Sequence, residues 1–185
     1  MPLTSQLLAE HEAVLVALDV LERVEGALAA GGEEAREHLD QLLDFLKVFV
    51  DRCHHGKEEE VLFPELERRG VPREGGPIGV MLAEHEEGRG HIRAMAAARD
   101  RLRRGELNAT AAIRTSASAY RDLLRAHIAK ENHILFPMAD QLVPAEVAVK
   151  LVAQFEAIEG ERIGAGKHEA YHTLLHHLKD RYGVV

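Results

Sequence analysis

Apolar residues recur every three or four positions along most of the chain, which is the spacing of one face of an α-helix. Glycines and the loop RGVPREGGP divide this pattern into four long helices followed by two shorter ones. The long helices are expected over about residues 4–30, 33–69, 77–104 and 108–142, and the shorter ones from Pro144 and over about 167–182. The pattern therefore predicts an all-α protein.

The four long helices form two hairpins, which pack naturally into a bundle. We expect residues 1–142 to form a four-helix up-down bundle and residues 143–185 to form a helical extension packed on it. Composition agrees, since the chain is 46% hydrophobic, only 4% aromatic and rich in residues that favour helices. Pro64 and Pro137 lie inside the second and fourth helical patterns, where a proline should kink or break a helix.

The two hairpins repeat one another in sequence. LAEHE stands at 8–12 and again at 82–86, and HHGKEEEVLFP at 54–64 is echoed by HIAKENHILFP at 127–137. The repeat distance is 74 residues between the first pair of motifs and 73 between the second. The chain is therefore predicted to be a duplicated helical hairpin followed by an appendage.

Six polar residues recur at matching positions on the apolar faces of the four helices. They are His11, His54, Glu58, His85, His127 and Glu131. Counted from the hairpin turns, the four histidines fall at one level of the bundle, and each glutamate follows a histidine by one helical turn. A single histidine on an apolar face is more often a hydrogen-bonded core residue than a ligand. Six in matching positions would be costly to bury unless a pair of divalent cations satisfied them.

The donor set limits the metal. Imidazole and carboxylate without thiolate suit iron, manganese or zinc. Glu58 and Glu131, one from each hairpin, are the natural bridges between two ions. Three protein groups from each hairpin leave coordination positions free for a small molecule.

With these motifs the chain resembles the hemerythrin-like family, also called the HHE cation-binding domain, over roughly residues 5–140. The resemblance implies a four-helix bundle holding a di-iron centre, with the four histidines as ligands and the two glutamates as bridges. It also implies a protein that binds, senses or reacts with dioxygen, nitric oxide or peroxide. The alternative is a metal-binding or iron-handling module, such as one for iron-centre repair, that performs no turnover.

One position departs from the oxygen-carrying members of that family, which have a further histidine one turn after the ligand of the third helix. Here that position is Arg89, which makes reversible oxygen carriage doubtful and a more reactive or differently completed site the better expectation. His55 and Glu59 repeat the histidine–glutamate spacing one residue out of phase and are expected around the ligands or at the surface. Glu12 and Glu86 are interpreted in the same way.

The C-terminal helix carries three more histidines at four-residue spacing, His168, His172 and His176. They are interpreted either as a solvated, histidine-rich surface that binds metal adventitiously, or as a cap in which His168, together with His172, ligates or gates the centre. The same segment holds the one Glu-x-x-His element, Glu169 to His172, so the several such elements that a ferritin-like oxidase needs are not present.

Charge and cysteine content exclude other classes. A formal net charge of -8 argues against a nucleic-acid partner, and no stretch is long and apolar enough for a membrane span. The single Cys53 cannot form an internal disulfide, and the N-terminus has no apolar signal segment, so a cytoplasmic location is expected.

Overall fold

The structure is a computed structural model that describes residues 2–106, 108–164 and 166–184, and within these ranges every regular element is a helix. The bundle contains α1 (Ser5–Ala29), α2 (Glu34–Phe45), α3 (Phe63–Arg68), α4 (Pro77–Arg103), α5 (Ala109–Lys130) and α6 (Phe136–Leu142). Three π-helical segments, η1 (Leu46–His55), η2 (Glu58–Leu62) and η3 (Glu131–Leu135), lie between them, and α7 (Ala145–Arg162) and α8 (Lys167–Tyr182) follow. The predicted all-α class is confirmed.

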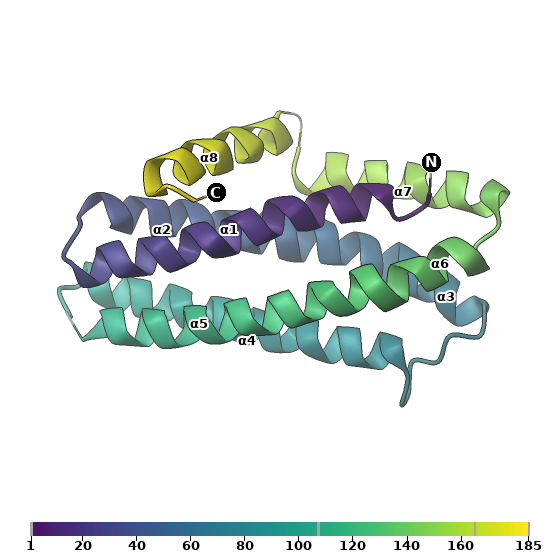
Figure 1. Cartoon of the computed structure of the whole chain (residues 1–185), viewed down its shortest axis with the longest axis horizontal. Coiled ribbons are helices and arrows are strands. Elements are labelled where there is room, and N and C mark those ends of the chain that lie inside the picture. The colour runs from purple at the N-terminus through teal and green to yellow at the C-terminus, as the bar shows by residue number, and fades with distance from the viewer. Residues whose placement is uncertain (1, 107, 165, 185) are drawn as a thin grey trace.

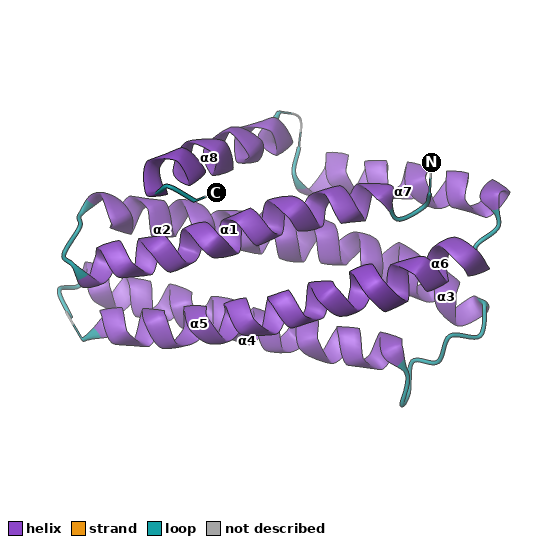
Figure 2. Ribbon diagram, in the orientation of Figure 1, coloured by secondary structure: helices purple, strands orange, loops and turns teal. Residues whose placement is uncertain are grey.

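The long helices run side by side along the longest axis of the molecule, and α7 and α8 lie end to end along one side (Figure 1). Helix α1 packs against α2, α5 and α8, and α4 packs along the length of α5. Short loops join the elements, as Figure 2 shows. No helix in the described ranges combines the length and apolar character needed to cross a membrane.

Two separate hydrophobic clusters fill the interior of the part of the chain that the structure describes. One includes Val14, Leu18, Val50 and Leu124, and the other includes Leu7, Val61, Met81 and Leu135. Each of the four continuous helical stretches, α1, α2 to α3, α4 and α5 to α6, contributes to both clusters, and its predicted polar residues lie between the two contributions. A buried polar layer therefore separates two apolar halves of the core.

The C-terminal helices cover both halves of this core. Phe155 of α7 is fully buried in the cluster that contains Leu7, and Leu178 of α8 is fully buried in the cluster that contains Val14. Loss of either helix would expose the apolar surface that it covers.

Of the kink or break expected at the two prolines, the break does not occur. The chain remains helical through Pro64 and Pro137, which occupy the first turns of α3 and α6, where backbone N–H groups need no helical acceptor. A π-helical segment precedes each proline, and the N–H of Phe63 donates to the carbonyl of Glu58, five residues earlier. Phe136 and Glu131 form the equivalent hydrogen bond. The wider π-helical turn thus accommodates the backbone N–H group that each proline lacks, and the helix continues.

Candidate metal centre

The four repeated histidines come from four different elements and reach the same buried layer. His11 lies on α1, His54 on η1, His85 on α4 and His127 on α5, and each is 1% exposed. Leu7 and Val14, one turn on either side of His11, are equally buried, so the apolar face predicted for α1 is the inward face. The convergence expected from counting back from the hairpin turns is observed.

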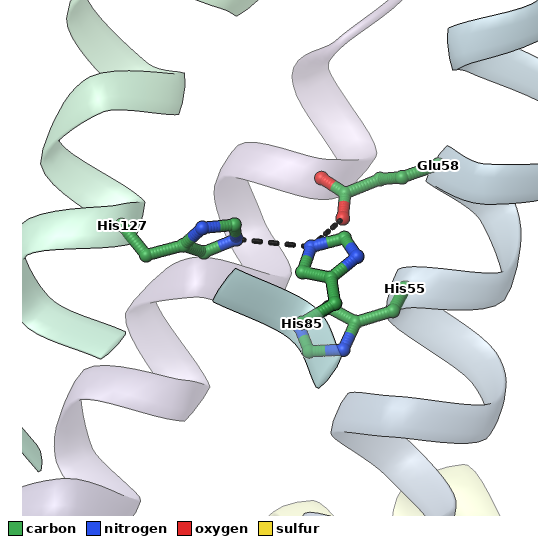
Figure 3. Close-up of side chains that lie close together, drawn as sticks. All are labelled: His55, Glu58, His85 and His127. Atoms are coloured by element: carbon green, nitrogen blue, oxygen red, sulfur yellow. Dashed lines mark hydrogen bonds and ion pairs between the residues drawn. The ribbon is translucent and has the colours of Figure 1, made fainter. Parts of the chain in front are cut away.

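The histidines form two pairs through their Nε2 atoms. The Nε2 atoms of His11 and His54 are 2.9 Å apart, and those of His85 and His127 are 3.1 Å apart. Figure 3 shows the second pair together with Glu58 and His55. Each pair therefore directs its ring nitrogens to one point in the core.

Each buried glutamate contacts one histidine of each pair. Glu131 Oε2 lies 3.2 Å from His11 Nε2 and 3.3 Å from His127 Nε2. Glu58 lies 3.6 Å from His54 Nε2 through Oε1 and 3.5 Å from His85 Nε2 through Oε2. Both carboxylates therefore span the two pairs, which is the position a bridging ligand needs.

The carboxylate oxygens in this layer have no hydrogen-bond donors. All four oxygens of Glu58 and Glu131 are buried without a hydrogen-bond partner, and both residues are 0% exposed. Leaving a buried acceptor unsatisfied costs about 1–3 kcal/mol, and more when it is charged. Four imidazoles and four carboxylate oxygens without donors are together a ligand set that fits a pair of cations.

The Nδ1 atoms of the four histidines are held from outside by hydrogen-bond acceptors. His54 Nδ1 donates to Glu10 at 2.7 Å, His85 Nδ1 to Glu59 at 2.7 Å, and His127 Nδ1 to Glu84 at 2.9 Å. His11 Nδ1 donates to the side-chain oxygen of Asn132 at 2.6 Å. Since these oxygens accept, the proton of each neutral ring sits on Nδ1 and the Nε2 lone pair faces the centre.

Two of these acceptors are themselves held by lysines at repeated positions. Lys57 donates to Glu10 at 2.5 Å, and Lys130 donates to Glu84. Burial favours a higher pKa for Glu10, but the hydrogen bond from His54 and the charge of Lys57 outweigh it and lower the pKa to about 2. Both carboxylates thus remain ionised acceptors at neutral pH.

In the metal-free layer, burial and neighbouring charges shift the pKa values of the buried side chains in opposite directions. Burial lowers the pKa of His54 to about 4, so its ring is neutral at pH 7. Burial and the neighbouring charge of Glu131 raise the pKa of Glu58 well above its ordinary range. The pKa of Glu131 is lowered despite its burial, because His127 and His11 offer it positive charge and hydrogen bonds when they bind a proton, and Glu131 in turn raises the pKa of His127. In the metal-free protein Glu131 is therefore ionised and Glu58 is neutral, although both lie in the same buried layer.

His55 is buried in this layer, so the surface alternative in the expectation for it is wrong. It is 4% exposed, and its ring stacks on that of His85 with centroids 3.8 Å apart. Its Nδ1 has no hydrogen-bond partner. His55, Glu58, His85 and His127 offer ligand atoms within 4.8 Å of one another, as do His11, His54, Glu58 and Glu131. The two adjacent histidines at 54 and 55 were the feature of the sequence that could have indicated a further candidate ligand.

Arg89 and the remaining acidic residues take other positions. Arg89 donates to Asp51 at 2.7 Å and to Glu59 at 2.6 Å, so it holds the acceptor of His85 in place. Glu12 and Glu86 are exposed, in agreement with the surface interpretation. The sequence reasoning missed Glu10 and Glu84, which precede the ligand histidines instead of following them.

The structure does not bring the C-terminal histidines into either cluster of ligand atoms. His168 lies 3.0 Å from Glu159 through Nδ1, and its Nε2 is 3.2 Å from the Nε2 of His172. Its ring stacks on Phe49 with centroids 5.5 Å apart. His176 is mainly exposed and lies near Asp180. None of the three reaches the buried layer.

Comparisons with known proteins agree with this geometry. The family model described as the hemerythrin HHE cation binding domain matches residues 3–139. The iron-sulfur cluster repair protein YtfE of Yersinia pseudotuberculosis serotype IB (strain PB1/+) is 31% identical over 130 residues, which cover 69% of this chain. The aligned region spans 56% of that protein, little more than half its length. No solved structure matches the chain.

Proposed function

Because the chain belongs to the hemerythrin HHE cation-binding family, we propose that it holds two iron ions and that this centre binds, senses or reacts with dioxygen, nitric oxide or peroxide. The ligands in this proposal are His11, His54, His85 and His127, with Glu58 and Glu131 as bridges. His55 is added as a further ligand on the side of His85 and His127.

A single observation carries the proposal: four inward Nε2 lone pairs surround four carboxylate oxygens that have no donor. Without a cation only bound protons can offset the buried carboxylates, and the raised pKa of Glu58 and of His127 reflects that demand. Two divalent ions would satisfy all of them. Imidazole and carboxylate ligands suit iron, and manganese or zinc could substitute for it.

When bound, iron would supply redox chemistry and open coordination positions for a small molecule. The chain's own residues orient and insulate the site. Glu10, Glu59 and Glu84 hold the rings through Nδ1, which fixes the tautomer and makes each Nε2 a stronger donor. Phe136 stacks on His11 and Phe63 on His85, so apolar side chains close one face of the layer. Bulk water is thereby kept from the imidazoles.

The geometry also supports the proposal that the bundle is a duplicated hairpin with alternating helix directions. The contacts His54–Glu10–Lys57 and His127–Glu84–Lys130 use the same positions of the two repeats. A cytoplasmic location remains a prediction from the cysteine content.

A second candidate function is iron handling in the repair of iron centres. The printed name of the Yersinia relative favours it, although the aligned region leaves much of that protein unmatched. In this function the centre would transfer iron and would not turn over a small molecule. The two candidates share the metal site and differ in whether the metal leaves.

The first experiment measures metal content and the absorption spectrum of protein purified from iron-replete cells. We expect two irons per chain and charge-transfer bands of a bridged pair. The double variant His54→Ala, His127→Ala should lose both, whereas His133→Ala, an exposed histidine on η3, should keep both. Wild-type protein that contains zinc alone, with an affinity unchanged in the double variant, would refute the proposed centre.

The second experiment separates the functions. Reduced, iron-loaded protein is mixed with dioxygen, nitric oxide or peroxide, and its spectrum is followed by stopped flow. A rapid spectral change with both irons retained supports the first candidate. Transfer of iron to a metal-depleted iron-sulfur protein, without reaction with the small molecules, supports the second.

A further inference from the structure

His168 and His172 repeat at the surface the feature that marks the buried centre. Their Nε2 atoms face each other at 3.2 Å, close to the 2.9 Å and 3.1 Å of the two buried pairs. Two nitrogens of a tetrahedral zinc site, each about 2.0–2.1 Å from the metal, are separated by about 3.3 Å. The pair is therefore already spaced for one cation.

The ring of His168 is held in place by contacts outside the helix that carries it. Its Nδ1 lies 3.0 Å from Oε1 of Glu159 on α7, and the ring stacks on Phe49 of η1. His172 packs edge-on against the same Phe49 ring. A carboxylate near Nδ1 favours the tautomer whose Nε2 lone pair is free, and this is the usual arrangement around metal-bound histidine.

The surroundings are acidic and open to solvent. A surface cleft of about 570 Å³ beside His168 is lined by Glu156 and Glu159, and a second cleft beside His172 includes Glu169. A cation would meet negative charge on approach, and water could fill the remaining coordination positions. Such a site would exchange its metal more easily than the buried layer.

His176 has the same four-residue spacing from His172, yet its surroundings differ. Its side chain is 80% exposed, and its Nδ1 lies 3.3 Å from Asp180 on the same helix. The contacts with Phe49 and Glu159 are made by His168 and not by His176. Spacing alone does not make a site here, so His176 serves as the matched control.

We propose that His168 and His172, oriented by Glu159, form a second metal site that is separate from the buried centre and binds one exchangeable divalent cation such as Zn²⁺ or Ni²⁺. Glu159 also accepts a hydrogen bond from Lys57 at 2.8 Å, and Lys57 holds Glu10 against His54. The same carboxylate therefore contacts the outer shells of both sites.

The test uses full-length protein with its buried centre already loaded with iron. Ni²⁺ and Zn²⁺ are titrated by calorimetry, and iron content is measured afterwards to show that the buried metal was not displaced. We expect one additional equivalent of cation. His168→Gln and His172→Gln should each weaken binding at least about tenfold, and Glu159→Gln should weaken it by roughly tenfold.

His176→Gln should bind the added cation within about twofold of the wild type, since it leaves both proposed ligands intact. The proposal is overturned if the iron-loaded wild type takes up no further cation, or if His176→Gln weakens binding as much as His168→Gln. Unchanged iron content and helical circular dichroism in these variants would show that any loss of binding belongs to the surface site. Failure at this site would leave the proposed function intact.

Discussion

Replacing Glu58 by glutamine should stabilise the metal-free protein and remove most of the stabilisation that metal gives. Both Glu58 oxygens are buried without donors, and burial together with Glu131 raises the pKa of Glu58 well above 4.5. A carboxyl that is ionised in the unfolded chain but protonated in the folded chain lowers stability at neutral pH. An amide of the same shape carries no such penalty.

The size of this effect has an upper bound. The free energy of unfolding can gain at most the cost of protonating a carboxyl of ordinary pKa 4.5 at pH 7, which is roughly 3 kcal/mol. For a chain of this size the gain in the melting temperature is at most roughly 10 °C. The gain should shrink as the pH falls toward 4.5, because the unfolded chain then binds the same proton and the difference between the two states disappears.

With metal bound, the wild type should be more stable than the Glu58→Gln variant, which is the reverse of the order without metal. A ligand present at 1,000 times its dissociation constant stabilises the folded state by about 4 kcal/mol, and the Glu58→Gln variant lacks the charged bridge needed for that affinity. Thermal melts are recorded with chelator and with ferrous iron under anaerobic conditions, at pH 5 and pH 7. Wild type should gain stability on adding metal, and the variant should gain little.

The control is Glu60→Gln, in the same π-helical segment. Glu60 is exposed and pairs with Arg162 at 2.7 Å, so its loss should change stability by less than about 1 kcal/mol with or without metal. If Glu58→Gln destabilised the metal-free protein as strongly as the loaded one, the carboxylate would have a structural partner. The argument from unsatisfied oxygens would then be wrong.

Four further predictions concern this layer and the apolar core beside it. Glu84→Gln should lower iron affinity by roughly tenfold in a chelator competition, since it loosens the ring of His127; an unchanged affinity would contradict this. His55→Ala should reduce the iron content from two per chain toward one, and a retained ratio of two would exclude His55 as a ligand. Cys53, which is 1% exposed and whose pKa burial raises to about 12, should react with a thiol reagent at pH 8 only when the protein unfolds. Tyr120→Phe removes a buried hydroxyl without a partner and should leave stability unchanged or raise it by about 1–3 kcal/mol in urea unfolding.

The helices and the level of the histidine layer could be predicted because both depend on regular spacing. The third helix, expected over about residues 77–104, is Pro77–Arg103, and Gly105 after it adopts a φ of 88° that favours glycine. The duplication gave a second, independent count of the same layer. Regular rise per residue was enough to bring His11 and His85 to one depth.

The rotation of side chains about the second helix could not be predicted in the same way. Leu46–His55 is π-helical, and a π-helical turn holds more residues than an α-helical one. Successive side chains are then separated by a smaller angle, so His54 and His55 both face the interior. The internal repeat pairs His55 with Ile128, and this pairing led to the expectation that His55 lies around the ligands or at the surface. The hydrogen-bond register that decides this point depends on tertiary packing.

The exceptions to the repeat make the two halves of the layer unequal. His55 corresponds to Ile128, Glu59 to Asn132, and Arg89 to Leu15. The half around His85 and His127 therefore gains an extra imidazole and a charged acceptor on His85, whereas His11 is held by the neutral Asn132. If two ions occupy this layer, the ion near His11 and His54 has fewer protein ligands and a less basic imidazole. The more open coordination, and with it the position for an incoming small molecule, belongs on that side.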